Sequence, residues 1–256
     1  CALGMKPELT MVSGNVKFDA ETAPDTDPLT MNLRDRFQLD GQRPVILAAS
    51  THANEETIIL NSLLQIINRT EAKPRLIIAP RHPERFVEVA DLLKASGLTW
   101  ARRSAGAAAG DAVAEVILLD SIGELHSVYP LASIVFVGGS LSKTGGHNII
   151  EPAAIGLPVI VGPHTYNFHS IVDAFCRADA IIQLNAPSDS ATIIELSDVI
   201  SDLLTNPSLR NEISARAQAL VKKNQGATQS TLELLKLHLP VFSQETSTSA
   251  SGAPAA

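Results

Sequence analysis

The segment richest in chemistry is a polar, glycine-rich stretch between residues 138 and 153. Two glycine pairs, Gly138-Gly139 and Gly145-Gly146, flank a polar loop that leads into an expected helix starting at Asn148. Unpaired backbone N–H groups at a helix N-terminus attract anions such as phosphate, and glycines let a ligand come close to the backbone. The pattern therefore predicts an anion site here, with a flexible loop and a simple helix cap as the alternative.

A carboxylate belongs to the same expected helix. Glu151 falls about one turn inside it, on the same edge as His147 and Asn148. Because a carboxylate repels phosphate, we expect Glu151 to accept hydrogen bonds from the sugar hydroxyls of a nucleotide. The stretch is not a Walker A loop, since no Gly-Lys-Ser/Thr closes it. It is not a Rossmann fingerprint either, since that motif follows the first strand.

An arginine at the end of another expected strand is the second candidate. Pro80 and Pro83 stiffen the loop that carries Arg81. A guanidinium held in this way can grip a phosphate or a carboxylate with two parallel hydrogen bonds. The structural alternative is a surface ion pair between Arg81 and Glu84. Arg85, further along, is expected to be a solvated helix residue.

Two more strand ends carry polar or flexible residues. His52 follows the first regular strand, and Glu55 begins the next helix, where capping of that helix is the alternative role. After another strand, Gly123 lets a ligand approach the backbone and Glu124 opens a helix. An ordinary strand-to-helix turn explains this second pattern equally well.

Other chemistry is not indicated. The sequence has no His/Cys cluster with metal-ligand spacing and no Gly-x-Ser-x-Gly nucleophile elbow. We therefore expect neither a metal nor a cofactor.

Alternating strands and helices must position these residues. Short apolar runs predict strands at 45–49, 76–79, 98–101, 116–119, 134–137, 158–161 and 180–183. Helices are predicted at 33–39, 55–68, 84–95, 124–129, 148–155, 167–175, 191–204, 207–223 and 227–237. This order is typical of an α/β fold, a Rossmann-like parallel sheet with helices on both faces. Ligands of such sheets bind at the carboxyl ends of the strands, where every candidate above lies.

The composition indicates a folded core and argues against nucleic-acid binding and a membrane span. Hydrophobic residues make up 45% of the 256 residues, which is enough for a core. A net charge of −7 argues against a general nucleic-acid binder. The two cysteines favour a reducing compartment, and no run approaches the roughly 18 apolar residues of a membrane span. No signal peptide is recognised, and the first residue is Cys rather than Met, so we expect a fragment or a processed chain.

The order of these motifs resembles the carboxyl-terminal half of the bacterial 3-deoxy-D-manno-octulosonic acid (Kdo) transferases. The resemblance covers roughly residues 10–235. It is carried by residues 14–19, 50–56, 80–86, 122–125 and 138–153, followed by 162–165. One departure is Asn54, where the family often has Gly; Asn tolerates left-handed backbone angles better than most residues.

The resemblance implies one half of a GT-B glycosyltransferase, in which two Rossmann-like domains face each other across a cleft. Residues 1–28 would be the end of the acceptor domain and a linker, 29–239 the nucleotide-sugar donor-binding domain, and 240–256 a disordered tail. The implied activity is transfer of Kdo from CMP-Kdo to a lipid A precursor (lipid IVA) in lipopolysaccharide core biosynthesis. The alternatives are a GT-B transferase with another nucleotide sugar, such as a UDP donor, and a non-catalytic fragment that binds CMP and transfers nothing.

The family motifs also imply site residues. Contacts to the CMP moiety are implied for Pro80, Arg81, Ile122, Gly123, Glu124, Asn148, Ile149, Ile150 and Glu151. His52 and Glu55 are candidate contacts to the donor sugar. No catalytic residue is expected in this chain, because the family's general base is a Glu of the amino-terminal domain.

The resemblance finally implies partners and a location. The partners are the donor CMP-Kdo, a lipid A precursor bound through the missing domain, and the inner-membrane surface, with no nucleic acid among them. The implied location is the cytoplasmic face of the bacterial inner membrane, with the anchoring segment outside this chain.

Overall fold

The computed structural model of the chain describes residues 4, 6, 10–19, 24 and 26–238. It divides into two compact units, one of residues 20–224 and the other of residues 1–19 with 225–256. The predicted domain boundaries at 28 and 239 remain predictions, and the predicted tail, 240–256, lies outside the described residues.

The larger unit is built on one sheet of seven parallel strands in the order β3-β4-β2-β1-β5-β6-β7. The strands are β1 (Val45–Thr51), β2 (Arg75–Pro80), β3 (Trp100–Arg102), β4 (Val116–Leu118), β5 (Ile134–Val137), β6 (Val159–Val161) and β7 (Ile182–Gln183). From β1 the chain builds first toward β2 and later, on the other side, toward β5, β6 and β7. The strand order therefore reverses between β1 and β5, which is where open α/β sheets bind ligands.

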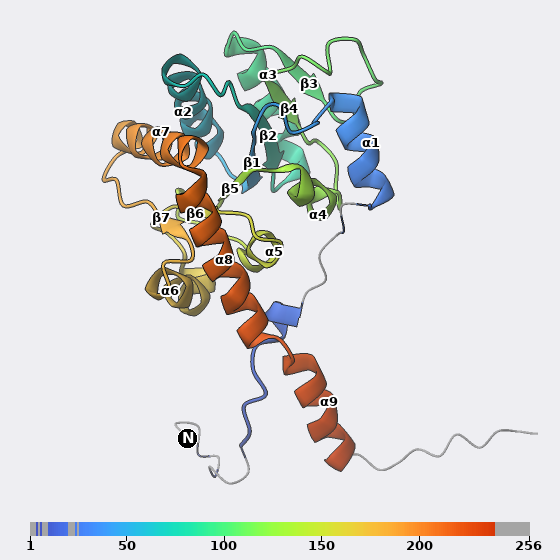
Figure 1. Cartoon of the computed structure of the whole chain (residues 1–256), viewed down its shortest axis with the longest axis vertical. Helices are drawn as coiled ribbons and strands as arrows, with labels where there is room; N and C mark the ends of the chain where they lie inside the picture. Colours follow the sequence, from blue (N-terminus) through green and yellow to red (C-terminus); the bar gives the residue numbers. More distant parts are fainter. Residues whose placement is uncertain (1–3, 5, 7–9, 20–23, 25, 239–256) are drawn as a thin grey trace, which may run out of the picture. The chain divides into compact units, whose positions relative to one another are not determined.

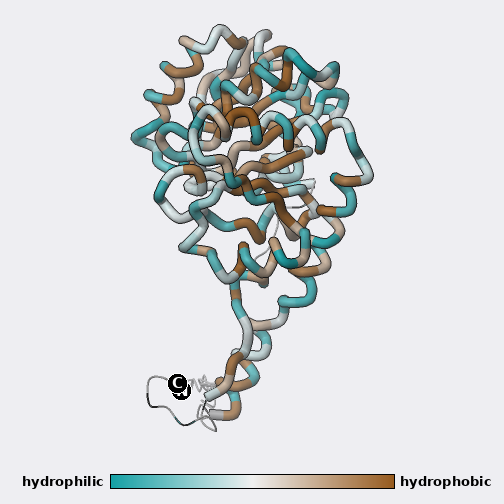
Figure 2. The backbone as a smooth tube through the Cα atoms, turned by 90° about the vertical axis from the view of Figure 1, so that its left-hand side faces the viewer, coloured by the Kyte–Doolittle hydropathy of each residue, from teal (hydrophilic) through white to brown (hydrophobic). Residues whose placement is uncertain are grey.

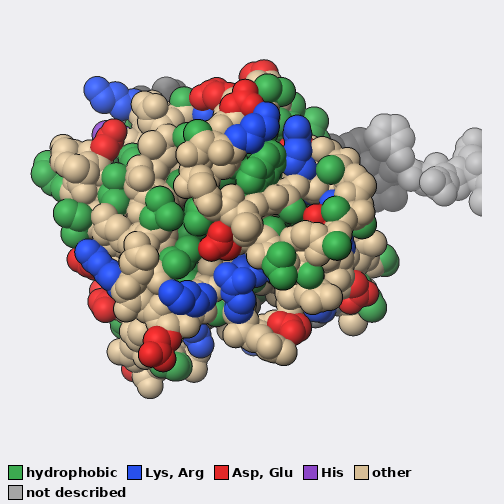
Figure 3. Space-filling view, turned by 90° about the horizontal axis from the view of Figure 1, so that it is seen from above, with side chains coloured by type: hydrophobic (Ala, Val, Ile, Leu, Met, Phe, Trp, Pro, Cys, Tyr) green, Lys and Arg blue, Asp and Glu red, His purple; other side chains and the backbone are tan. Residues whose placement is uncertain are grey.

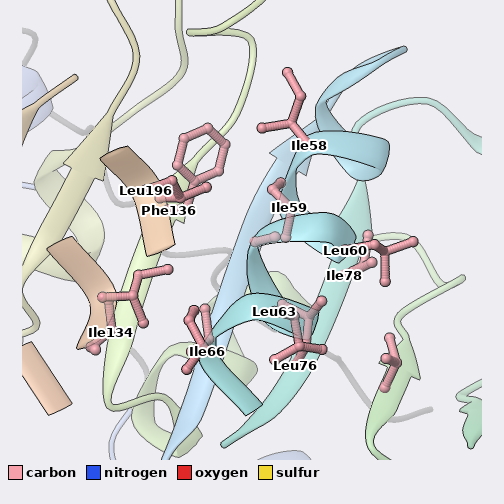
Figure 4. Close-up of a cluster of buried hydrophobic side chains, with 14 of the residues drawn as sticks. Ile58, Ile59, Leu60, Leu63, Ile66, Leu76, Ile78, Ile134, Phe136 and Leu196 are labelled. Atoms are coloured by element: carbon pink, nitrogen blue, oxygen red, sulfur yellow. The ribbon is translucent and has the colours of Figure 1, made fainter. Parts of the chain in front are cut away.

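One face of the sheet is covered by α2 (Glu55–Arg69), α3 (Phe86–Ala95) and α7 (Asp189–Thr205), with part of α8 (Pro207–Asn224). Figure 4 shows Leu63 and Ile66 of α2 against side chains of β2 and β5. Phe136 at the centre of β5 is 1% exposed. The apolar residues of α2 recur at helical spacing, and this spacing gives the helix an apolar stripe that packs on the sheet and against α7.

The opposite face is buried as well. Leu47 in β1 and Val135 in β5, which point away from α2, are both 0% exposed. Figure 1 shows α1 (Pro28–Phe37), α4 (Leu125–Val128) and α5 (Ile150–Ala154) on the side of the sheet away from α2 and α7. Helix α6 (His169–Arg177) follows β6. The predicted parallel sheet with helices on both faces is confirmed, and Figure 2 shows its apolar strands in the middle of this unit.

The observed start of one helix differs from the predicted start because a side chain caps it. Helix α1 begins at Pro28 and not near residue 33, because Asp27 caps it by accepting the backbone N–H of Thr30. Several helices are also preceded or followed by a tight 3-10 turn: η3 (Pro83–Arg85), η4 (Tyr129–Leu131) and η5 (Tyr166–Phe168).

The smaller unit contains η2 (Val16–Asp19) and α9 (Ala227–His238). The Asp19 carboxylate accepts the backbone N–H groups of Gly226 and Thr228, each at 2.6 Å. Hydrogen bonds from the side chain and the backbone of Thr228, and from the backbone of Gly226, lower the pKa of Asp19. Asp19 thus acts as a cap for α9 from a distant part of the sequence.

The surface charges and the helices bear on whether the chain has a nucleic-acid face or a membrane span. On the face seen in Figure 3, Lys and Arg side chains are interspersed with Asp and Glu, and no continuous basic field covers it. None of the helices in the described part of the chain is both long and apolar enough to cross a membrane.

Candidate functional site

Four adjacent strands bring the predicted site residues to one edge of the sheet. β4 leads to Gly123, β2 ends at Pro80 and Arg81 follows it, β1 leads to His52, and β5 leads to the stretch that contains Asn148. All these strands are parallel, so their carboxyl ends share an edge. Residues that the sequence separates by up to about a hundred positions therefore meet at the reversal of the strand order.

A cavity of about 110 Å³ opens at this edge. Pro80, Arg81, Ile122 and Gly123, all predicted site residues, are part of its lining. A larger cavity of about 790 Å³ lies at the amino ends of the strands, beside Pro44. None of the predicted site residues lines that larger cavity, so the smaller one is the candidate site.

Arg81 is the available cation of this cavity. Its backbone N–H donates to the carbonyl of Thr51 at 2.9 Å, which holds the loop against the end of β1. Its side chain is exposed, and no hydrogen bond or ion pair of its guanidinium is found within the described residues. The alternative of a surface pair with Glu84 is not seen, because that carboxylate lies 3.7 Å from Nδ1 of His82. Arg81 is therefore free to bind an anion.

Glu124 is held by the protein itself. Its carboxylate accepts hydrogen bonds from Arg103 Nε and Nη2 at 2.9 and 3.2 Å, and from the hydroxyl of Ser121 at 2.6 Å. Sequence reasoning missed Arg103, which follows β3 and carried no motif. The pair fixes the loop whose neighbouring residues, Ile122 and Gly123, line the cavity.

Glu55 holds the glycine-rich loop in place through hydrogen bonds to its backbone. It is 1% exposed, and its oxygens accept the backbone N–H groups of Gly139, Leu141, His52 and Ser142 at 2.8 to 3.3 Å. Burial raises the pKa of the Glu55 carboxyl, and these amide hydrogen bonds act in the opposite direction. A carboxylate with both oxygens engaged and no exposed face does not fit the predicted contact to a donor sugar. Its role is structural.

Gly138 is required by the protein rather than by a ligand. A Cβ atom there would lie 2.5 Å from the carbonyl oxygen of Ser50 and 2.7 Å from Cα of Thr51. Gly123 differs, because its φ of +81° favours glycine but no atom lies within 4 Å of an added Cβ. The sequence could not separate these two roles, since both only require a missing side chain.

These two glycines give a matched pair of variants. We expect Gly138→Ala to lower the free energy of unfolding by about 3 kcal/mol, as overpacking against backbone does, and Gly123→Ala by only about 1 kcal/mol. Urea unfolding followed by circular dichroism measures both. Equal losses in the two variants would contradict the packing role of Gly138.

The helix expected from residue 148 is shorter than predicted. α5 runs over five residues, Ile150–Ala154. Asn148 lies before it, accepts the backbone N–H of Ile150 at 3.1 Å and donates Nδ2 to Glu151 at 2.8 Å. Ile149 and Ile150 are at most 1% exposed as whole residues, so neither offers free surface to a ligand in this structure. The predicted helix start at Asn148 is therefore wrong by two residues, the anion site stays a prediction, and the polar pair of Asn148 and Glu151 remains a candidate for hydroxyl groups.

Three histidines gather beside Arg81. Nε2 of His52 lies 2.8 Å from Nε2 of His147, and the rings of His52 and His82 meet edge to face with centroids 5.1 Å apart. Burial and the nearby positive groups lower the pKa of His52, and burial, His52, Arg81 and His82 lower that of His147 to about 4. In the described residues, no group of three or more His, Cys, Asp or Glu side chains is arranged to hold a metal ion.

Arg85 supports this cluster, and its prediction as a solvated residue is wrong. Its side chain is 13% exposed and forms ion pairs with Glu56 and Glu88. Glu56, 1% exposed, also accepts the hydroxyl of Thr51 at 2.7 Å. Arg85 therefore ties the loop after β2 to the end of β1.

The Asn54 backbone has a φ of 71°, in the left-handed region that Gly adopts easily, as the Gly of the family at this position suggested.

Curated proteins with similar sequences are known. The chain is 37% identical over 237 residues to the 3-deoxy-D-manno-octulosonic acid transferase of Haemophilus influenzae, covering 93% of this chain and 53% of that protein. It is also 37% identical over 227 residues to the enzyme of that name from Bordetella pertussis, covering 88% of this chain and 51% of that one. The chain thus spans about half the length of the curated relatives it matches.

Solved structures with a similar fold are known as well. The C-terminal CMP-Kdo binding domain of WaaA from Acinetobacter baumannii is 35% identical and matches with a TM-score of 0.65, over 75% of this chain and 96% of that domain. WaaG, a glycosyltransferase involved in lipopolysaccharide biosynthesis, is 15% identical with a TM-score of 0.51, covering 86% of this chain and 55% of that one, and shares the fold. No protein-family model matches the chain.

Proposed function

Because the chain belongs to the family of 3-deoxy-D-manno-octulosonic acid (Kdo) transferases, we propose that it binds the donor CMP-Kdo for transfer of Kdo to a lipid A precursor. One observation carries the proposal: Arg81, without a side-chain partner in the described residues, stands at the mouth of a small cavity at the carboxyl edge of the sheet. A nucleotide needs these two features side by side, a slot for the base and a cation for the phosphate.

In this proposal the cytosine ring occupies the cavity. Its volume of about 110 Å³ is well below the range of about 300–1,000 Å³ typical of pockets for drug-sized ligands, so it has room for one ring. Pro80, Phe86 and Ile122 supply apolar walls, and Gly123 leaves its backbone reachable. Backbone N–H and C=O groups can then read the polar edge of the base.

The phosphate and the ribose lie outside the cavity. Arg81 binds the phosphate, and Glu151 with Asn148 binds the ribose hydroxyls. The hydrogen bond between Asn148 and Glu151 fixes both side chains before the ligand arrives, which lowers the entropy cost of binding. The contacts implied for Ile149 and Ile150 rest on the family resemblance alone, since both residues, backbone included, are at most 1% exposed.

The reaction follows from the charges. When the bond between Kdo and CMP breaks, its electron pair goes to the CMP phosphate, and the acceptor hydroxyl attacks from the opposite face with inversion. Arg81 stabilises the charge that develops on the phosphate, as preorganised donors do in other transferases. The base that removes the acceptor proton comes from outside this chain, so the chain alone binds the donor and transfers nothing.

The remaining parts belong to the whole transferase. We propose lipid IVA as the acceptor, bound through a second Rossmann-like domain in a GT-B arrangement, at the cytoplasmic face of the bacterial inner membrane. Nucleic acid is not a partner in this proposal, in keeping with the net charge of −7.

Calorimetric titration with CMP and UMP tests the donor assignment. We expect CMP to bind at least about tenfold more tightly than UMP, because the wrong base leaves a buried polar group unpaired. Glu151→Ala is expected to weaken CMP binding by about five- to tenfold through loss of the hydroxyl contacts. Equal or tighter binding of UMP favours a transferase for another nucleotide sugar, and unchanged CMP affinity in Glu151→Ala would remove this residue from the site.

A further inference from the structure

We infer that His52, His82 and His147 form an anion subsite next to Arg81, and that this subsite takes up a proton when the donor's negatively charged group binds. The group is a phosphate or a sugar carboxylate, since the same chemistry recognises both. The inference rests on the proposed function and adds to it a second recognition element and a coupling to protons.

The three imidazoles come from three loops at the reversal of the strand order. His52 follows β1, His82 follows β2, and His147 ends the glycine-rich loop after β5. His52 lies between the other two. Its ring is nearly parallel to that of His147 and meets it edge to edge through the two Nε2 atoms, and it meets His82 edge to face, each at 5.1 Å between ring centroids. Arg81 is the residue before His82 and lines the nucleotide cavity. The cluster therefore continues the site from the cavity toward the region where the sugar of the donor must lie.

The contact between His52 and His147 sets how many protons the pair can hold. Their Nε2 atoms are 2.8 Å apart, so a single hydrogen lies between them. In the neutral pair one ring donates through Nε2 and keeps an unprotonated Nδ1. One further proton can add at that Nδ1 without breaking the hydrogen bond, whereas a second would place two N–H groups face to face. The pair can therefore take up one proton.

Without a ligand the pair is kept neutral by its surroundings. Burial, His82, Arg85 and Arg81 lower the pKa of His52, and burial, His52 and Arg81 act in the same way on His147. The acids nearby do not offset this effect. Glu55 is engaged by backbone amides, and Glu56 and Glu88 by Arg85.

Glu84 faces only the exposed edge of His82, at 3.7 Å from Nδ1, with 75% of its side chain exposed. Burial is the largest cause of the lowered pKa of both rings, and Arg81 is a smaller one. A donor anion must therefore act on the imidazoles directly: its charge attracts the added proton and also offsets the repulsion from Arg81. The pKa of the pair then rises toward neutral pH, and a proton is bound. Because the bound state holds more protons than the free state, affinity must rise as pH falls through this range, by at most about tenfold per pH unit for one proton.

Titration calorimetry of the full chain with CMP at pH 7.5, in two buffers of different ionisation enthalpy, measures this uptake. We expect about half a proton or more per CMP bound. His147→Gln keeps a polar side chain and removes the pair, and its uptake is expected to fall to about zero, because the CMP phosphate is almost fully ionised at this pH and takes up no proton beside a cation. His169→Gln removes an exposed histidine at the start of α6 and is expected to behave as the unchanged protein. Equal uptake in His147→Gln and the unchanged protein would overturn the inference.

Nitrogen NMR of the unchanged chain avoids any effect of the substitution on folding. On adding CMP, the imidazole nitrogens of His52 and His147 are expected to move toward protonated shifts at pH 7. Nitrogens that move with neither CMP nor free Kdo, while CMP still binds, overturn the inference and leave the proposed function intact, whereas no CMP binding overturns the proposed function. Repeating the titration with free Kdo separates the two sources: a response to CMP alone assigns the phosphate, and a response to Kdo assigns the sugar carboxylate.

Discussion

Replacing Arg81 by alanine is expected to weaken CMP binding by about 10- to 100-fold, the range for losing a hydrogen-bonded charge partner of a phosphate. Arg81 has no side-chain partner in the described part of the chain, so the substitution removes no contact that holds the fold together. Its backbone N–H, which does support the loop, is retained in alanine. The expected loss is therefore one of affinity with little loss of stability, and calorimetric titration with CMP measures it.

Two further variants sharpen this test. Arg81→Lys keeps the charge but not the two-pronged geometry, so an intermediate affinity is expected. Arg177→Ala removes another exposed arginine, paired with Asp173 within α6, and should leave CMP binding unchanged. If Arg81→Ala binds CMP as tightly as the unchanged protein, Arg81 does not contact the nucleotide.

Replacing Glu55 by alanine is expected to lower the free energy of unfolding by about 3–5 kcal/mol. The substitution leaves four backbone N–H groups at the end of β1 and in the glycine-rich loop without their acceptor. Because this loop leads to His147, Asn148 and Glu151, CMP affinity should fall together with stability. Guanidinium unfolding and CMP titration on the same preparation measure the two effects.

Glu212→Ala is the matched control for this substitution. Its side chain is 65% exposed and lies 3.7 Å from Arg216, so a change within about 0.5 kcal/mol is expected. Glu55→Gln removes the charge but keeps the size, and its NH₂ group would face the backbone N–H groups. A stability loss is expected there too. If Glu55→Ala unfolds at the same denaturant concentration as the control, the carboxylate does not hold the loop.

The fold was predictable because burial on both faces leaves a clear pattern. Residues 45–49 are apolar without alternation, and in the structure the whole run is buried in β1 between two neighbouring strands. The spacing of apolar residues in α2 predicted its extent within about one residue, because a helix that packs on a sheet needs a single apolar stripe. The rule that ligands bind at the carboxyl edge then placed Arg81 and Asn148 together.

The parts that could not be predicted depend on partners far apart in the sequence. Glu55 accepts amides more than 80 positions away, and Arg103 reaches Glu124 over 21 positions. Nothing local distinguishes such a buried carboxylate from a ligand contact. The helix predicted from Asn148 begins only at Ile150, because the Asn148 side chain accepts the backbone N–H of Ile150 and Asn148 itself stays outside the helix.

A crystal structure of the chain grown with CMP would show directly where the nucleotide binds. We expect the cytosine ring in the cavity between Pro80 and Ile122, with its phosphate on the guanidinium of Arg81 and its ribose beside Glu151. Density for CMP in the larger cavity near Pro44, or elsewhere on the surface with Arg81 still unpaired, would contradict this placement.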